Sequence, residues 1–98
     1  MSVTKRELAR RVAERAAMPQ AQTLELVQLT LEAISEALLE ERRLELRGFG
    51  IFEIKTRAAR KARDPRTKTT MDVPPRNTVS FRASQSLKDA LAELPLEP

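Results

Sequence analysis

The feature that most restricts how this chain can fold is a basic stretch, residues 55–76. It carries eight lysines and arginines against two aspartates, a net charge of +6, whereas the segments before and after it each sum to −1. Residues 57–70 show no alternation of apolar and polar side chains, so they offer no hydrophobic face for packing on a core. The stretch is either a solvated face or a polyanion-binding element, and its concentration in an otherwise nearly neutral chain favours the second.

Two helices are expected before the basic stretch. Thr4, with Glu7 three residues later, has the pattern of a capping box, and apolar residues recur behind it at helical spacing, which predicts a helix over 5–16. Pro19 suits the start of a second helix over about 20–41. A heptad seam runs along that helix through Leu24, Val27, Leu31, Ile34 and Leu38. Further apolar residues widen this surface, and we interpret it as a dimer contact beside an intrachain core, because the roughly 76 residues outside an arm form a marginal domain.

From Arg43 onward the pattern changes to that of β-strands. Leu44 and Leu46 alternate with charged residues, and residues 51–57 are rich in β-branched and aromatic types. Between these runs stand Gly48 and Gly50, the only glycines in the chain. They predict a tight hairpin or a close approach of two backbones.

The chain is expected to return from the basic stretch as a strand through Met71, Val73 and residues 78–81. Pro74 and Pro75 must then lie at an edge or a bulge, because proline cannot donate to a strand ladder. A last helix over about 85–93 follows, with Ser84 as its N-cap.

These elements predict an α+β fold. It has two N-terminal helices, a three-stranded antiparallel sheet with a long protruding β-hairpin arm, and a short C-terminal helix. We expect one domain over residues 1–94, with the arm over about 56–75, and a loose tail over 95–98.

Several classes of function are excluded by composition. The chain has neither cysteine nor histidine, so it offers no disulfide, thiolate nucleophile, zinc finger or histidine base. Most carboxylates are interleaved with arginines, as in solvated ion pairs, and Asp64 with Asp72 is poor support for a metal-dependent nuclease. We therefore expect no enzyme and no cofactor. No apolar run suits a membrane span and no secretory signal is recognisable, so a cytoplasmic protein is expected.

The chemistry of the arm points to nucleic acid. Lysine and arginine supply affinity for a phosphate backbone that depends on salt. The arm has no aromatic side chain on which bases of a single strand could stack. Pro65, between Arg63 and Arg66, is either an ordinary turn proline or an apolar wedge of the kind that minor-groove binders insert between base steps.

Three segments together resemble the bacterial HU/IHF family of histone-like proteins. They are residues 48–54 (GFGIFEI), residues 57–65 (RAARKARDP), and Phe81 followed by residues 87–90 (LKDA). The resemblance covers Thr4 to about Leu91. It implies an intertwined dimer in the bacterial nucleoid whose two arms wrap double-stranded DNA in its minor groove. Phe49, Phe52 and Phe81 then match core positions and are structural.

The resemblance also implies which residues contact DNA. Pro65 matches the intercalating proline at the arm tip. The positively charged DNA-binding residues on the arm and the body are expected to be Lys5, Lys55, Arg57, Arg60, Lys61, Arg63, Arg66, Lys68, Arg76 and Lys88.

Three places depart from the family's common pattern. Lys68 stands where glycine is frequent, which changes the dihedral options of the turn and adds a positive charge. Asp64 stands where asparagine is usual, so it places a negative charge beside Pro65. Ala83 and Ser84 replace a common Pro-Gly, which puts in doubt a close backbone contact with DNA, although Ser84 can cap the helix.

Three alternatives for the function stay open from the sequence. An HU-like protein is largely indifferent to sequence and often homodimeric. An IHF-like subunit prefers particular sites and pairs with a different but related chain. A module that binds structured RNA shares the same basic footprint.

Overall fold

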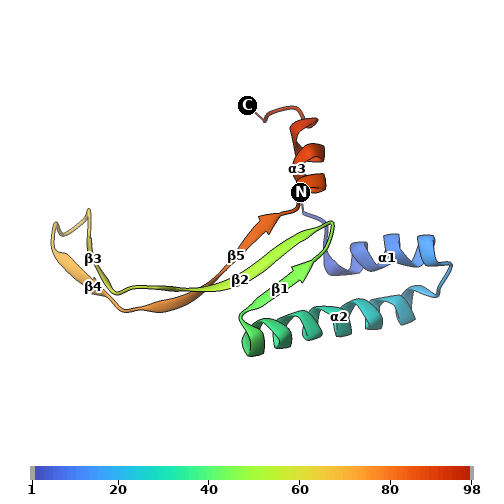
Figure 1. Ribbon diagram of the computed structural model, residues 1–98, viewed down its shortest axis with the longest axis horizontal. Coiled ribbons are helices and arrows are strands. Elements are labelled where there is room, and N and C mark those ends of the chain that lie inside the picture. The colour runs from blue at the N-terminus through green and yellow to red at the C-terminus, as the bar shows by residue number, and fades with distance from the viewer. Residues whose placement is uncertain (1, 98) are drawn as a thin grey trace. The chain divides into compact units, whose positions relative to one another are not determined.

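The computed structural model describes residues 2–97 and confirms the predicted α+β fold class (Figure 1). Its elements are α1 (Lys5–Ala16), α2 (Gln20–Glu41), β1 (Arg43–Leu46), β2 (Gly50–Arg57), β3 (Arg60–Arg63), β4 (Thr70–Val73), β5 (Arg76–Ala83) and α3 (Gln85–Ala92). The chain divides into two compact units, the first ending at Ala37 and the second beginning at Leu38. A single domain over residues 1–94 stays a prediction.

The first unit contains α1 and most of α2. The Thr4 side chain accepts a hydrogen bond from the Glu7 backbone N–H at 3.2 Å, as a helix N-cap does. The capping box is only half made, because the Glu7 carboxylate accepts from the Arg10 Nε–H at 2.8 Å. Ala9 and Ala13 on α1 and Thr23 on α2 are buried, and they form the small interior of this unit.

The second unit contains a three-stranded antiparallel sheet with the order β1-β2-β5. Gly48 and Gly50 serve two different purposes, which the sequence offered as alternatives. Gly48 has a φ of +84° in the β1–β2 turn, a conformation that costs glycine little. A Cβ on Gly50 would lie 2.5 Å from Phe81 Cε1 and 2.6 Å from the Arg82 carbonyl oxygen. Gly50 therefore permits β2 and β5 to pair closely at this point.

The start of α3 is tied to the β1–β2 turn. Ser84 Oγ accepts from the Leu87 N–H at 3.2 Å, which confirms the predicted N-cap. The same hydroxyl donates to the Gly48 carbonyl at 2.9 Å, and the Ser84 N–H donates to the Phe49 carbonyl at 2.8 Å. These bonds tie the start of α3 to the β1–β2 turn, which belongs to the sheet.

A separate two-stranded ladder, β3 with β4, forms the outer part of the arm and extends the line of β2 and β5 (Figure 1). Arg57 pairs with Arg76 at the end of the β2–β5 ladder, and Arg60 pairs with Val73 at the start of the β3–β4 ladder. Two residues on each side separate these pairs, so the register continues without a bulge and Pro74 and Pro75 face residues 58–59. The prolines interrupt the hydrogen bonds because they lack an N–H. Only two strands remain there, so both are edges, as expected.

Few apolar side chains are buried within the described residues. The buried ones are Ala9, Ala13 and Leu38. Three phenylalanines cluster around the sheet, with ring centroids of Phe52 and Phe81 4.8 Å apart and those of Phe49 and Phe81 5.3 Å apart. Even so, Phe49 is 49% exposed and Phe81 is 45% exposed. The cluster is therefore open to solvent on one side.

Candidate nucleic-acid interface

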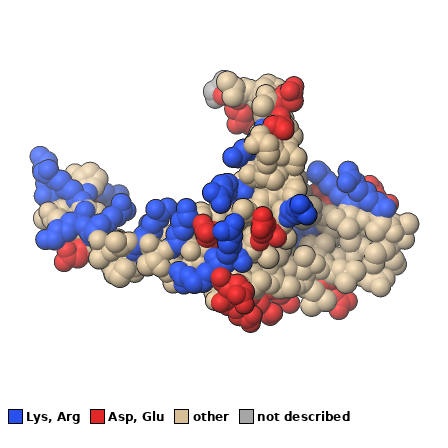
Figure 2. All heavy atoms as spheres, in the orientation of Figure 1, with Lys and Arg blue, Asp and Glu red and all other residues tan. Residues whose placement is uncertain are grey.

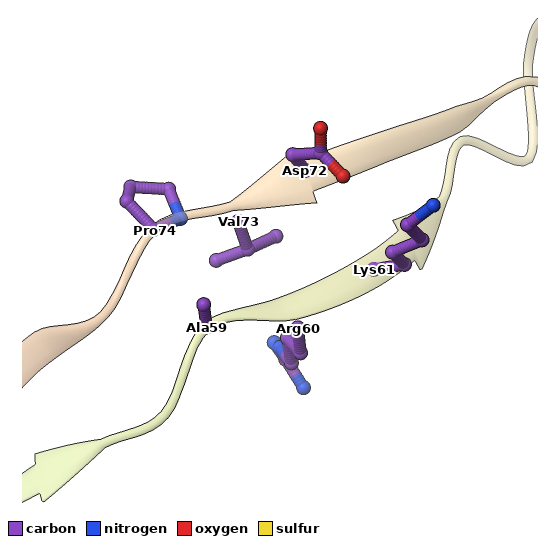
Figure 3. Close-up of a pocket in the computed structure, with 6 residues that line it drawn as sticks. All are labelled: Ala59, Arg60, Lys61, Asp72, Val73 and Pro74. Carbon is purple, nitrogen blue, oxygen red and sulfur yellow. The ribbon is translucent and has the colours of Figure 1, made fainter.

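The arm presents two chemically different faces, since successive residues of a strand point to opposite sides. One face carries Lys61 and Arg63, opposite Asp72 and Thr70. The other carries Arg60 with Val73, and Ala62 with Met71. Figure 3 shows the same division, with Lys61 and Asp72 on one side of the ribbon and Arg60 and Val73 on the other.

The second face also carries apolar side chains, contributed mostly by the returning strand. Ala62 and Val73 are half-buried and Met71 is 49% exposed, so the arm does have a small apolar patch. Residues 57–70 alone gave no sign of it, because Met71 and Val73 come from the returning strand and meet Ala62 only across the ladder. Beside it, Ala59, Arg60, Lys61, Asp72, Val73 and Pro74 line an open hollow of about 550 Å³ (Figure 3).

Pro65 lies exposed in the turn that joins β3 to β4. The turn is closed by the Asp64 N–H, which donates to the Thr69 carbonyl at 2.9 Å, and by the Lys68 N–H, which donates to the Asp64 carbonyl at 2.8 Å. Asp64 Oδ1 accepts from the Arg66 N–H at 2.8 Å. This aspartate therefore shapes the tip, in the way that Asx turns do. The fixed φ of proline also suits a turn, so the wedge role of Pro65 stays a prediction.

Lys68 occupies the left-handed region, with a φ of +58°. A glycine adopts that conformation without a steric cost, whereas an L residue pays for its Cβ. The backbone at Lys68 therefore has a conformation that suits glycine, while the side chain there is a cation.

Two arginines lie directly opposite each other where the arm begins. The last pairs between β2 and β5 are Thr56 with Asn77 and Arg57 with Arg76, which together form the arm root. Like charges opposite each other on a sheet are destabilising. An anion held between Arg57 and Arg76 would relieve that repulsion.

The cations of the arm form no ion pair with a carboxylate within residues 2–97, although Asp72 is the cross-strand neighbour of Lys61. The ion pairs there lie on α1, where Arg10 contacts Glu7 at 2.8 Å and Glu14 at 2.6 Å. The hydrogen bond from Arg10 lowers the pKa of Glu7. Figure 2 shows Lys and Arg covering much of the arm, with few acidic atoms among them. The arm is therefore the part of the second unit best suited to hold a polyanion.

Two further cations on the body, Arg47 and Arg82, were not among the predicted site residues. They line a hollow of about 310 Å³ together with Lys88, Ser84 and the acidic Glu45. Arg47 directly precedes the Gly-Phe-Gly run and Arg82 follows Phe81, so the motifs already identified could have indicated them.

The other predicted site residues fall in different places. Lys55 and Arg57 are on β2, Arg76 is on β5, and Arg66 is in the tip turn. Lys5 is on α1 in the first unit, where its Nζ donates to Gln28 Oε1. The structure therefore gathers the arm residues and separates Lys5 from them by unit.

Comparison with known proteins gives consistent matches over most of the chain. The family described as bacterial DNA-binding protein matches residues 3–92. DNA-binding protein HU-1 of Halalkalibacterium halodurans is 39% identical over 89 residues, which are 91% of this chain and 99% of that protein. DNA-binding protein HU of Geobacillus stearothermophilus is 36% identical over 89 residues, with the same coverage of each chain.

A solved structure is also similar. The HU chain of an Anabaena HU–DNA cocrystal structure superposes with a TM-score of 0.84 at 33% identity, covering 93% of this chain and 99% of that one. Separately, no helix within residues 2–97 is both long enough and apolar enough to span a membrane.

Proposed function

Because the chain belongs to the family of bacterial DNA-binding proteins, we propose that it is an architectural protein that binds double-stranded DNA and bends or wraps it. The observation that carries this proposal is the arm, whose cations form no ion pair with a carboxylate within the described residues and include Arg57 directly opposite Arg76. Family membership confirms the resemblance inferred from the motifs. It also confirms the expectation that the chain is not an enzyme.

The arm enters the minor groove and Pro65 is the wedge between base pairs. Support comes from its exposure in the tip turn and from the rigidity of its ring, which has little rotamer entropy to lose. Unstacking a base step costs on the order of a few kcal/mol. Contacts of the arm cations with phosphates along the bent duplex offset that cost.

Each DNA-contacting cation adds to affinity without reading sequence. On the arm and at its root the contacts come from Lys55, Arg57, Arg60, Lys61, Arg63, Arg66, Lys68 and Arg76. On the body, Lys88 and Lys5 contact flanking DNA once the duplex is bent. Arg47 and Arg82 join Lys88 because they line the same hollow.

The protein is HU-like, with low sequence specificity. Any preference comes from how easily a sequence bends and from the width of its groove. The arm has no aromatic side chain, which argues against single strands. Relatives named DNA-binding protein HU favour this proposal over an IHF-like subunit that prefers particular sites.

The functional unit is a homodimer in which a second copy covers the open apolar surfaces. Support comes from the few buried apolar residues and from Phe49 and Phe81, each about half exposed. On the first unit, the exposed apolar residues include Leu8, Val12, Leu26, Leu29 and Leu31. A chain of 98 residues with so small a core gains its stability by association. Because its ligand is the bacterial chromosome, the protein acts at the nucleoid, in the cytoplasm.

Binding of the purified chain tests the proposal across a series of salt concentrations. The ligands are a short random-sequence DNA duplex, the same duplex with a nick, and a duplex RNA of equal length. We expect salt-dependent binding to both DNAs, with the nicked DNA preferred because it bends at lower cost. Preference for the RNA would overturn the proposal, and failure of a folded chain to bind either DNA would point to a second subunit or a defined site.

A further inference from the structure

Arg42 is held in an unusual position between α2 and β1. Its φ is +64°, a left-handed conformation that is strained for an L residue and that glycine commonly supplies after a helix. The Arg42 N–H donates to the Leu38 carbonyl at 2.9 Å, and its carbonyl accepts from the Ile54 N–H at 2.9 Å. The backbone of Arg42 thus links the end of α2 to β2.

The Arg42 side chain reaches the arm root. Its Nη2 donates to Thr56 Oγ1 at 3.1 Å and lies 3.5 Å from Asn77 Oδ1. Thr56 Oγ1 in turn donates to Asn77 Oδ1 at 2.8 Å. The guanidinium therefore bonds to one strand directly and to the other at the limit of hydrogen-bond length, at the pair next to Arg57 and Arg76.

We infer that Arg42 is a positioning residue that holds the direction in which the arm leaves the sheet. The effect of Arg42 on DNA binding rests on the proposed function, whereas its effect on the arm of the free protein does not. Beyond the arm root only two strands continue, and a two-stranded ribbon alone is marginal. A side chain that joins both of its strands to the end of α2 restricts how the ribbon swings, and pre-ordering of this kind lowers the cost of binding.

Thr56→Val is the sharpest variant. It removes the hydroxyl that accepts from Arg42 and donates to Asn77, but it keeps the β-branched shape and the charge of the chain unchanged. Thr78→Val is the matched control, because Thr78 lies on the neighbouring pair with Lys55 and its hydroxyl only reaches the Lys55 carbonyl at 3.4 Å. Arg42→Asn removes the guanidinium that donates to Thr56. Asparagine is short, and it tolerates a left-handed backbone.

The first readout is made without DNA, from NMR order parameters of the Arg57 and Arg76 backbone amides. We expect them to fall in Thr56→Val from about 0.85 toward about 0.6, the range of flexible backbone, and to stay at the wild-type value in Thr78→Val. Because Arg42→Asn acts on the same bonds, combining it with Thr56→Val should lower them no further. Equal order parameters in Thr56→Val and Thr78→Val would overturn the inference.

The second readout uses DNA carrying a dye at each end. Thr56→Val should broaden the distribution of energy transfer and weaken binding roughly three- to ten-fold, as expected for loss of about one hydrogen bond. Its salt slope should equal that of wild type, because no phosphate contact is removed. An unchanged distribution despite mobile arms would overturn the link to bending. A wild-type protein that binds no DNA would contradict the HU-like, sequence-indifferent part of the proposed function, while the order parameters would still decide the role of Arg42.

Discussion

At the residue scale, the two glycines differ in what a side chain would meet. Gly50→Ala would place a methyl group 2.6 Å from the Arg82 carbonyl oxygen, a backbone atom that cannot move without separating the strands. We expect a loss of about 2–4 kcal/mol in the free energy of unfolding, measured by urea denaturation. A loss below that of Gly48→Ala would contradict the close approach.

Gly48→Ala is the matched substitution. Nothing lies within 4 Å of the added Cβ, so the cost comes only from the φ of +84° and should be about 1–2 kcal/mol. The sequence predicted a turn or a close approach for this pair of glycines. The sequence alone does not tell which glycine forms the turn and which permits the close approach. That depends on the Phe81 ring and the Arg82 carbonyl, which β5 places beside Gly50.

Ser84 also belongs to the residue scale. Ser84→Ala removes the cap of α3 and the bond to the Gly48 carbonyl, and we expect it to lower the free energy of unfolding by about 1 kcal/mol. Ser86→Ala, which loses a bond of 3.1 Å to the same carbonyl but no cap, is the control in the same thermal melts. A smaller shift in the melting temperature for Ser84→Ala than for Ser86→Ala would refute the capping role.

At the scale of elements, the helices and strands could be predicted closely from the sequence. Capping by Thr4 and Ser84 and the breaks at Pro19 and Gly48 are local signals, so they can be identified without knowledge of the fold. The continuous register across the arm and the apolar patch of Ala62 with Met71 could not be predicted. Both depend on which residues of the two arm strands face each other.

The arm is the element that supplies salt-dependent affinity. Replacing Arg60 and Arg63 together with alanine should weaken binding to every sequence alike. It should also lower the slope of log affinity against log salt by roughly 2, about one for each arginine. Replacing Arg11 and Arg15 on α1 removes the same charge outside the arm and should leave the slope nearly unchanged. A slope unaltered by the arm variant, in a binding titration over salt, would contradict its role.

At the scale of the whole molecule, the open apolar surfaces predict that folding is coupled to association. The midpoint of thermal unfolding should rise with protein concentration, and sedimentation should give twice the chain mass of 11.1 kDa. The apolar residues that widen the surface of α2 beyond its heptad seam indicated this association from sequence, but the half-exposed phenylalanines became visible only in the folded chain. A midpoint that is independent of concentration would show that the single chain is stable alone.

Bending of DNA by the arm is the central claim, and end-to-end energy transfer on a doubly labelled duplex tests it most directly. Wild-type protein should raise the transfer as the duplex ends approach. Pro65→Ala should bind nearly as tightly and raise it less, because the phosphate contacts remain while the wedge is lost. Saturating binding of the wild-type protein with no change in transfer would contradict bending, and equal transfer with Pro65→Ala would contradict the wedge.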